Sequence, residues 1–533
     1  MAILSSRTSP LKDVIIGIDA GTSVIKAVAF DLSGKQLASA AVPNRYTTSA
    51  DGAATQSLTQ TWQDCARTLR DLATKLDNLE KRTAALAVTA QGDGTWLVGR
   101  GNAPVCDAWL WLDARASPTV ARLTAAAENG ARFEATGTGL NTCQQGSQLA
   151  HMDRYAPDLI NQAEVAFHCK DWLFLNLTGV RVTDPSESSF TFGNFRTRQY
   201  DENAIHSLGL SHHRKLLPEI VDGSQTTFPL TADAALATGL LQGTPVSLGY
   251  VDMAMTALGA GVYTEGRGSA CSTVGSTGVH MRAVKAEDVV LNPECTGYVI
   301  ALPIPGIVTQ VQTNMAATLN IDWILRLAND VLEGFGKSPS QADLVGHIET
   351  WLSKSLPGTL LYHPYISDAG ERGPFVNADA RADFIGLSMS HGFADLVRAV
   401  IEGLGMAMRD CYTMMGALPS EVRVTGGATR SVALRRILSA AVNAPLRISQ
   451  REETGAAGVA MMAAVAIGVY PSMDSCIADW VTPLLGHVEA VDSELANVYA
   501  RLYPTYFSAR QALTPIWQGL STYRLESSQG NRT

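Results

Sequence analysis

The chain lacks the features that mark most secreted, membrane-spanning and nucleic-acid-binding proteins. Its eight cysteines are scattered without a C-x-x-C pair, so their spacing predicts neither a zinc site nor a disulfide framework. The net charge is −9 and no basic block offsets it, which argues against nucleic acid as a partner. The most apolar later stretch, 455–470, is too short and too rich in Ala and Gly to span a bilayer. These absences predict a soluble, reduced, cytoplasmic protein without a membrane partner.

The length and composition predict more than one globular domain. With 533 residues the chain is too long for a single hydrophobic core, and 46% hydrophobic against 17% charged residues is a globular balance. Residues 1–12 carry too short an apolar stretch for a signal peptide and are expected to be a disordered lead-in. Motifs along the chain divide the remainder into an N-terminal domain at 13–262, a C-terminal domain at 263–487, and a helical extension and tail at 488–533, whose end from 526 is expected to be disordered.

A glycine turn between two apolar runs lies near the start of the chain. Residues 14–18 have the length and composition of a buried strand, and a second apolar run at 24–30 follows directly after the turn. A third strand at 36–42 follows another glycine turn. This pattern predicts an antiparallel β-meander rather than a β-α-β unit.

The residues of the first turn are suited to binding a phosphate. Gly21 allows the backbone to approach a ligand closely, and successive N–H groups with the hydroxyls of Thr22 and Ser23 can cradle an anion. Asp19 ends the strand and can hold Mg²⁺ directly or through water, and Lys26 adds a cation nearby. The alternative at this point is an ordinary glycine hairpin.

Two later glycine turns resemble the first. The segment 275–278, G-S-T-G, again joins two apolar segments, which suggests a second phosphate loop in a duplicated domain. A strand at 421–425 ends in a double glycine that permits a flat nucleobase or ribose to lie on the backbone, although a tight packing turn is the plain alternative. The candidate nucleotide-binding residues of these two turns are Gly275, Ser276, Thr277, Gly426, Gly427 and Ala428.

Polar side chains follow two further predicted strands. Gln91 and Asp93 come after the strand at 83–89, and ligands of α/β sheets gather at the carboxyl ends of strands. A solvated D-G turn is the alternative there. Asp252 follows the strand at 246–250 and precedes a helix, so it is either a helix N-cap or a general base that faces a cleft, and these roles are compatible.

Four other features carry weaker expectations. Trp111 forms either part of the core or one wall of a sugar site, because it stands beside polar residues. The glycine-rich polar loop at 136–148 is predicted to lie on the surface. Residues 184–186, D-P-S, predict an Asx turn. In the helix after the double glycine, Arg435 and Arg436 are expected to face away from the apolar stripe.

Taken in chain order, these motifs resemble the FGGY family of carbohydrate kinases over nearly the whole length of the chain. Each motif alone is a weak signal, but the ordered set is specific. The matching pieces are I-D-A-G-T-S at 18–23, W-L-D-A-R at 111–115, G-Y-V-D at 249–252, G-S-T-G at 275–278, G-E-R-G-P-F at 370–375, G-L-S at 386–388 and V-T-G-G-A at 424–428.

The resemblance implies an α/β protein with two ribonuclease-H-like domains, of the actin-type ATPase fold, and a deep cleft between them. It implies transfer of the ATP γ-phosphoryl group to a terminal hydroxyl of a small polyol or sugar, with ATP and Mg²⁺ as cofactors. Erythritol is the expected acceptor, and a pentitol, a ketopentose or glycerol are the alternatives. The rivals from other classes are a chaperone or filament ATPase of the same fold and a catalytically silent sugar-binding regulator.

The family's functional residues map onto this chain by motif. Asp252 matches the catalytic base and Asp19 the metal-associated aspartate. The remaining matches are Gly21, Thr22, Ser23 and Lys26 for the first phosphate loop, Gly275, Ser276 and Thr277 for the second, Gly426, Gly427 and Ala428 for adenosine, and Gln91, Asp93 and Trp111 for the acceptor.

The chain departs from the family pattern at three places. Gly92 and Asp93 stand where glycerol kinases carry an Arg-Glu pair, which makes glycerol a less favoured acceptor. Met253 replaces the usual Gln or Asn after the catalytic Asp, and Gln148 stands where many members have Lys. These changes predict a neutral acceptor and leave its identity open. A homodimer is one possible oligomeric state, which the sequence does not decide.

Overall fold

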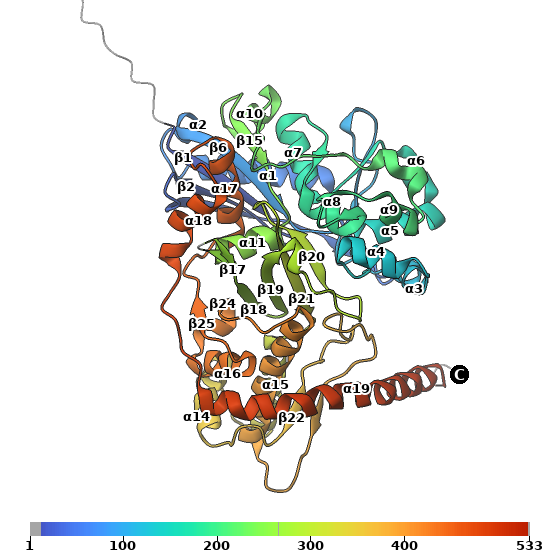
Figure 1. Ribbon diagram of the computed structural model, residues 1–533, viewed down its shortest axis with the longest axis vertical. Coiled ribbons are helices and arrows are strands. Elements are labelled where there is room, and N and C mark those ends of the chain that lie inside the picture. Colours follow the sequence, from blue (N-terminus) through green and yellow to red (C-terminus); the bar gives the residue numbers. More distant parts are fainter. Residues whose placement is uncertain (1–11, 265, 531–533) are drawn as a thin grey trace, which may run out of the picture.

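The computed structural model describes residues 12–264 and 266–530, which form two α/β halves, one above the other in Figure 1. Almost all of the expected lead-in at 1–12 lies outside the described residues. Each half contains a six-stranded sheet. Among the described residues, no helix is both long enough and apolar enough to cross a membrane.

The sheet of the N-terminal half has the strand order β14-β15-β6-β1-β2-β3. β1, β2 and β3 form the predicted antiparallel meander, and β6 and then β15 add in parallel on the other side of β1. The strands are β1 (Val14–Ala20), β2 (Val24–Asp31), β3 (Gln36–Pro43), β6 (Thr83–Ala90), β14 (Phe228–Pro229) and β15 (Pro245–Leu248).

The sheet of the C-terminal half has the order β20-β21-β19-β18-β24-β25, which, read from the other end, repeats the N-terminal arrangement except that its outermost strand β20 lies beside the meander, whereas β14 lies beside β15. β18, β19 and β21 are antiparallel, and β24 and β25 follow in parallel beside β18. The repeat confirms the two-domain α/β fold. The strands are β18 (Ala270–Val274), β19 (Gly278–Lys285), β20 (Tyr298–Ala301), β21 (Ile307–Asn314), β24 (Val422–Thr425) and β25 (Leu446–Ile448).

Two helices, α11 (Asp252–Ala260) and α17 (Thr454–Ala466), lie against each other between the two sheets (Figure 1). Their contact is close because it is made through glycine. A Cβ on Gly259 would lie 2.1 Å from the Thr454 carbonyl oxygen, and one on Gly458 would lie 2.1 Å from that of Met255. α17 also packs on β1 and β6, so a segment late in the sequence completes the core of the N-terminal half.

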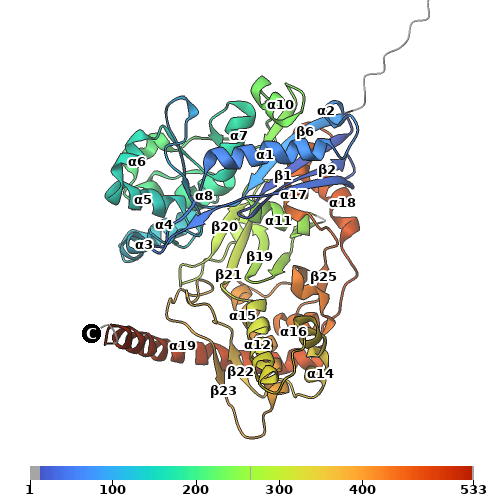
Figure 2. The same cartoon turned by 180° about the vertical axis from the view of Figure 1, so that it is seen from behind.

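The other helices pack around the two sheets, with two exceptions (Figures 1 and 2). In the N-terminal half they are α1 (Leu58–Ala73), α2 (Leu79–Arg82), α3 (Ser117–Thr124), α4 (Asn129–Thr136), α5 (Gln145–Tyr155), α6 (Pro157–Gln162), α7 (Cys169–Thr178), α8 (Pro185–Phe192), α9 (Glu202–Ser207) and α10 (Ala232–Thr238). In the C-terminal half they are α12 (Thr318–Gly334), α13 (Gln341–Gly346), α14 (Ile348–Ser353), α15 (Phe393–Met414), α16 (Val432–Val442), α18 (Met473–Trp480) and α19 (Ser493–Gly530). The exceptions are α3–α6 with α9, which form a lobe beside the N-terminal sheet, and α19, which projects from the C-terminal half.

Short strands form the small sheets outside the two main ones. These are β4 (Thr47–Thr48), β5 (Ala54–Gln56) and β8 (Ala108–Trp109); β7 (Trp96–Val98) and β9 (Val165–Phe167); β10 (Val182–Thr183) and β13 (Glu219–Ile220); β11 (Gly193–Asn194) and β12 (Gln199–Tyr200); β16 (Tyr263–Thr264) and β17 (Arg267–Gly268); and β22 (Leu361–His363) and β23 (Asp383–Ile385).

Three sequence-based expectations are wrong. The loop at 136–148 is largely buried, because it packs on the C-terminal half, where the Gly139 N–H donates to the Gly297 carbonyl at 2.9 Å. Arg435 is buried rather than outward-facing and pairs with Glu489 at 2.9 Å, while Arg436 does face solvent. Disorder was predicted from 526, but α19 continues as a helix to 530, and its C-terminal part projects from the body of the molecule (Figure 2).

Candidate active site

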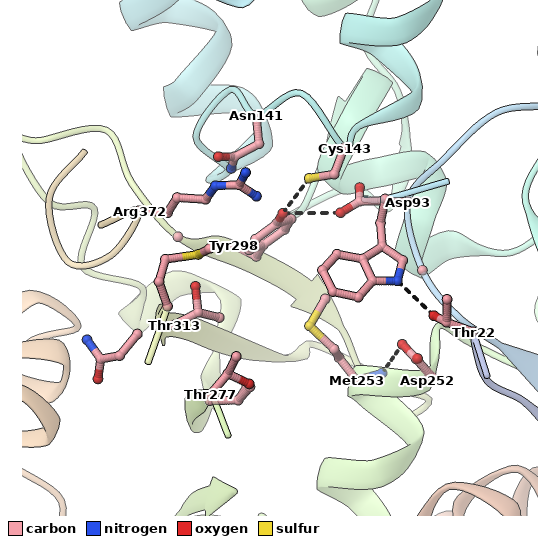
Figure 3. Close-up of a pocket in the computed structure, with 16 residues that line it drawn as sticks. Thr22, Asp93, Asn141, Cys143, Asp252, Met253, Thr277, Tyr298, Thr313 and Arg372 are labelled. Atoms are coloured by element: carbon pink, nitrogen blue, oxygen red, sulfur yellow. Dashed lines mark hydrogen bonds between the residues drawn. The ribbon is translucent and has the colours of Figure 1, made fainter. Parts of the chain in front are cut away.

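A cavity of about 280 Å³ lies between the two halves, and both halves contribute side chains to it (Figure 3). We call it the acceptor cavity. From the N-terminal half it is lined by Thr22, Gly92, Asp93, Trp111, Asn141, Cys143, Asp252 and Met253, and from the C-terminal half by Thr277, Val279, Gly297, Tyr298, Thr313, Asn314, Met315 and Arg372.

Asp93 reaches the cavity from the loop after β6. Its backbone is in the left-handed region, with φ +58°, and its N–H donates to Glu187 Oε1 at 2.8 Å. The Tyr298 hydroxyl donates to Asp93 Oδ2 at 3.1 Å, whereas Oδ1 is buried without a hydrogen-bond partner in the described part of the chain. Burial raises the pKa of this carboxyl group. One oxygen is therefore free to accept a hydrogen bond from a ligand hydroxyl.

Asp252 reaches the cavity from the junction between β15 and α11. It is the first residue of the helix, and Val251 occupies the N-cap position, so the N-cap alternative is wrong. Asp252 Oδ1 accepts the Met253 N–H at 2.7 Å, and the residue lines the cavity, as a general base would have to. Burial raises its pKa well above the usual range, and the negative charges of Asp19 and Glu187 add to that rise. Met253 lines the cavity beside it with a thioether, so this part of the wall is apolar.

Thr22, Trp111 and Gln91 form a chain of hydrogen bonds at the edge of the cavity. The Trp111 Nε1–H donates to Thr22 Oγ1 at 2.8 Å, and the Thr22 hydroxyl donates to Gln91 Oε1 at 2.8 Å. Trp111 is 40% exposed and forms a wall, so the core alternative for it is wrong. Gln91 is buried, does not line the cavity, and is held by Gln56 at 2.7 Å.

Several residues that line the cavity were not singled out from the sequence, among them Tyr298, Cys143, Asn141 and Arg372. Tyr298 lies on β20 and bridges Asp93 and the Cys143 thiol, with an O···S distance of 3.4 Å. Burial raises the pKa of that thiol, so it is not a nucleophile at neutral pH. Asn141 lies in the loop that was predicted to be at the surface. Arg372 lies within the G-E-R-G-P-F motif, and this motif is the sequence signal that could have indicated it as a site residue.

A second hollow, of about 540 Å³, lies beside the glycine turn that follows β24. We call it the nucleotide cleft. Gly426 has φ +94°, and a Cβ there would lie 2.6 Å from the Val274 carbonyl oxygen, so this position requires glycine. Gly427 is exposed, and a Cβ added to it would meet no atom within 4 Å. The cleft is lined by Thr256, Thr273, Thr425, Gly426, Arg430, Ser449, Gln450, Arg451, Glu452 and Thr454.

Asp19 lies at the carboxyl end of β1, against the start of α17. A Cβ on Gly455 would lie 2.3 Å from Asp19 Oδ2, so glycine at this point of α17 makes room for the carboxylate. Burial raises the pKa of Asp19 to about 6, and Lys26 acts against that rise. Lys26 itself pairs with Glu453 at 2.8 Å. An added cation would favour the charged form of Asp19, which suits a carboxylate that holds Mg²⁺.

The predicted phosphate loops approach the cavity from opposite halves. Thr22 of the β1–β2 turn and Thr277 of the β18–β19 turn both line the acceptor cavity. Ser23 and Ser276 are exposed beside them. The structure therefore brings the first two glycine turns to the same cavity, whereas the third turn, at 426–428, borders the nucleotide cleft.

Two domains of this type, facing each other across a carboxylate-lined cavity and a glycine-bordered cleft, define a two-domain phosphotransferase of the sugar-kinase kind. The chain belongs to the FGGY family of carbohydrate kinases: the model of the family's N-terminal domain matches residues 14–259, and that of its C-terminal domain matches 270–467. The chain is therefore a carbohydrate kinase that uses ATP, and not a chaperone or filament ATPase.

Individual proteins in the family are similar to this chain to different degrees. An erythritol kinase from Brucella abortus (strain 2308) is 68% identical over 510 residues, which covers 96% of this chain and 98% of that protein. A gluconate kinase structure from Lactobacillus acidophilus matches with a TM-score of 0.85 at 20% identity, covering 95% of this chain and 99% of that one. A xylulose kinase structure from the same organism matches with a TM-score of 0.84 at 21% identity and the same coverage. These two structures support the fold alone.

Proposed function

We propose that this kinase phosphorylates a terminal hydroxyl of erythritol. The observation that carries the proposal is the acceptor cavity, in which two carboxyl groups, of the buried Asp93 and the half-buried Asp252, face a small space. Carboxylates accept hydrogen bonds from hydroxyl groups and repel an anionic acceptor, so a neutral polyol is favoured over a sugar acid. The 68% identity to an erythritol kinase over 96% of the chain supports erythritol among the polyols.

Asp252 is the proposed general base. Phosphoryl transfer passes through a loose transition state, so catalysis depends mainly on positioning and on charge stabilisation. Asp252 would accept the proton of the attacking hydroxyl as the oxygen bonds to phosphorus, and Asp93 Oδ1 would orient the polyol through a second hydroxyl. Trp111 and Tyr298 would form the walls that exclude water from the reacting oxygen.

Asp19 is the residue that would hold Mg²⁺, which when bound offsets negative charge on the phosphates. Its position at the end of β1, beside the first glycine turn, supports this role, and the bound cation would offset the rise in pKa that burial causes. Lys26 would act through Glu453 rather than on a phosphate directly, since the two are already paired.

The glycine turns would hold the nucleotide mainly through backbone N–H groups. Gly21, Thr22 and Ser23 would face the phosphates from the N-terminal half, and Gly275, Ser276 and Thr277 from the C-terminal half. Gly426, Gly427 and the backbone of Ala428 would carry the adenosine. The Thr22 hydroxyl is occupied by Gln91 and Trp111, so we assign Gln91 to the support of Thr22 and Trp111 to the acceptor.

A coupled ADP-release assay tests the acceptor. The full-length protein is assayed with erythritol, glycerol, ribitol, xylitol, xylulose and gluconate at saturating ATP and Mg²⁺. We expect the highest kcat/KM with erythritol and little ADP release without an acceptor, because domain closure would protect the phosphoryl group from water. A higher kcat/KM with glycerol or xylulose would contradict the proposal.

Three further expectations remain proposals. The domains are placed at 13–262, 263–487 and 488–533. A cytoplasmic location fits the use of ATP and the eight cysteines, all of which are free. A homodimer is to be tested by light scattering.

A further inference from the structure

Five titratable side chains form a buried cluster behind the acceptor cavity. They come from the starts of α7 and α8, and none of them lines the cavity. The Lys170 ammonium lies 3.0 Å from Asp171, 2.7 Å from Asp184 and 2.5 Å from Glu187, and all four side chains are fully buried. The His168 ring lies 3.4 Å from Asp171 and 3.6 Å from Glu187. We call these residues the ionic cluster.

Local capping explains part of the ionic cluster but not all of it. Asp171 accepts the His168 N–H, and Asp184 accepts the Ser186 N–H, so both cap the helices that they precede or begin. Lys170 and Glu187 have no such role. Burying ionised groups costs free energy that their pairing recovers only in good geometry, so a buried ion pair is weak evidence for a role in stability. Burial raises the pKa of Glu187 to about 7, against the opposing charges of His168 and Lys170.

One arm of the ionic cluster leads to Asp93. Glu187 Oε2 contacts Lys170, and Glu187 Oε1 accepts the Asp93 backbone N–H at 2.8 Å. This bond holds a residue with a positive φ of 58°, which a non-glycine residue seldom adopts without support. The adjoining Gly92 has no room for a side chain, since a Cβ would lie 2.4 Å from Val251 and 3.5 Å from Glu187 Oε1.

The other arm leads to Asp252. Asp184 accepts the Ser186 hydroxyl, and Ser186 Oγ in turn accepts the Val251 backbone N–H at 2.9 Å. Val251 immediately precedes Asp252, at the point where β15 passes into α11. The two carboxylates of the cavity come from different strands, and Lys170 is linked to both of them through Glu187 and Asp184.

We propose that the ionic cluster is the positioning element of the acceptor site, with Glu187 setting Asp93 and the Asp184–Ser186 pair setting Asp252. This inference rests on the proposed function, in which Asp93 orients the acceptor and Asp252 accepts its proton. Small displacements of groups that act on the reacting atoms cost large factors in rate. At a pH where Asp252 is ionised, the two arms therefore separate kinetically: the Glu187 arm governs the KM of the acceptor, and the Ser186 arm governs kcat. Both constants are measured at such a pH, because the charge of Glu187 also adds to the raised pKa of Asp252.

The test uses two conservative variants of the full-length chain, because replacing Lys170 would leave buried carboxylates unpaired and endanger folding. Ser186→Ala removes the hydroxyl that accepts the Val251 N–H. We expect kcat to fall by about 5- to 100-fold while the KM for ATP stays unchanged. Glu187→Gln keeps the shape of the side chain but cannot accept from both Lys170 and the Asp93 N–H, so we expect the acceptor KM to rise by a similar factor.

Ser189→Ala is the matched control. Ser189 is also buried in α8, one turn further on, and its hydroxyl donates only to the Ser186 carbonyl at 3.3 Å. We expect kinetics close to those of the unaltered protein. ADP binding, measured by calorimetry, should be retained in all three variants, because the nucleotide cleft lies elsewhere.

The outcomes separate this inference from the proposed function. Each variant is assayed with whichever acceptor the unaltered protein uses best, so a different preferred acceptor would overturn the erythritol proposal and leave this test intact. Unaltered kcat in Ser186→Ala together with unaltered acceptor KM in Glu187→Gln would overturn the inference. A fall in kcat in Ser189→Ala as large as that in Ser186→Ala would also overturn the inference, as would loss of ADP binding together with activity. Either result would show a general role in folding.

Discussion

The acceptor cavity and the nucleotide cleft differ in the groups that they present to a ligand. In the acceptor cavity, side chains are held by other side chains: Tyr298 bonds Asp93, and Trp111 bonds Thr22. At the nucleotide cleft, the glycine turn at 426–427 presents exposed backbone. A cavity of buried, oriented polar groups discriminates among acceptors through the hydrogen bonds that a wrong acceptor leaves unmade. The turn at 426–427 is proposed to carry the adenosine of ATP, which is the same whichever acceptor is phosphorylated.

This difference predicts that substitutions in the two regions change different kinetic constants. Changes of Asp93, Asp252 or Tyr298 in the acceptor cavity should alter kcat or the KM of the polyol and leave ATP binding intact. Changes at the glycine turn of the nucleotide cleft should raise the KM for ATP and leave polyol selection intact. Kinetics of single-residue variants, with each substrate varied in turn, test this separation.

The largest effect is expected from Asp252→Asn. The amide is nearly the same size but cannot accept the proton, and general-base catalysis contributes about 10²- to 10⁴-fold. We expect kcat to fall by about this factor, with ADP affinity unchanged by calorimetry. Near-normal turnover would remove Asp252 from the mechanism, and loss of ADP binding would break the separation between the two regions.

A smaller effect is expected from pH. Asp252 acts when ionised, and burial with nearby negative charge raises its pKa well above the usual value. The protonated fraction therefore grows as the pH falls through this raised pKa, and kcat/KM should fall by about tenfold per pH unit below it. The acid limb of the pH–rate profile should lie well above the pKa of about 3.9 for an ordinary Asp. A limb at that ordinary value would contradict the desolvation of Asp252.

At the nucleotide cleft, Gly426→Ala should weaken the binding of ATP. Its φ of +94° disfavours a side chain, and the Cβ would lie 2.6 Å from the Val274 carbonyl oxygen. We expect strain of about 1–3 kcal/mol and, as the turn shifts, a several-fold rise in the KM for ATP with the acceptor KM unchanged. Gly468→Ala is the control for backbone strain, since Gly468 also has a positive φ, of +76°, no atom lies within 4 Å of the added Cβ, and the residue lines neither site. A change in acceptor preference in Gly426→Ala would be the contrary result.

The smallest effect is expected from Tyr298→Phe, which removes a single hydroxyl from the wall of the acceptor cavity. Asp93 Oδ2 would lose its donor, and a hydrogen bond of this kind contributes about 0.5–1.5 kcal/mol. The acceptor kcat/KM should therefore fall by about 2- to 12-fold, with ATP kinetics unchanged. Steady-state kinetics with each substrate varied in turn measure this, and an equal effect on ATP would contradict the separation.

The sequence predicted the parts of this protein that are specified locally. Apolar runs bounded by Asp, Gly and hydroxyl residues indicated the hairpin at 14–30, and strand ends indicated the place of Asp252. These signals lie within a few residues of each other, because strand length, glycine conformation and helix starts depend on neighbours in the chain. The order of such motifs was also sufficient to predict the family.

Tertiary structure alone decided which side chains face the acceptor cavity. Tyr298 and Asp93 are 205 positions apart, and no pattern near either residue predicts their hydrogen bond. The loop at 136–148 is polar and rich in glycine, as surface loops are, yet it is buried because the other half of the molecule covers it. The role proposed for the ionic cluster likewise depends on α8, whose Glu187 and Ser186 accept the backbone N–H groups of Asp93 and Val251. Such contacts follow from the packing of whole elements, which local composition does not encode.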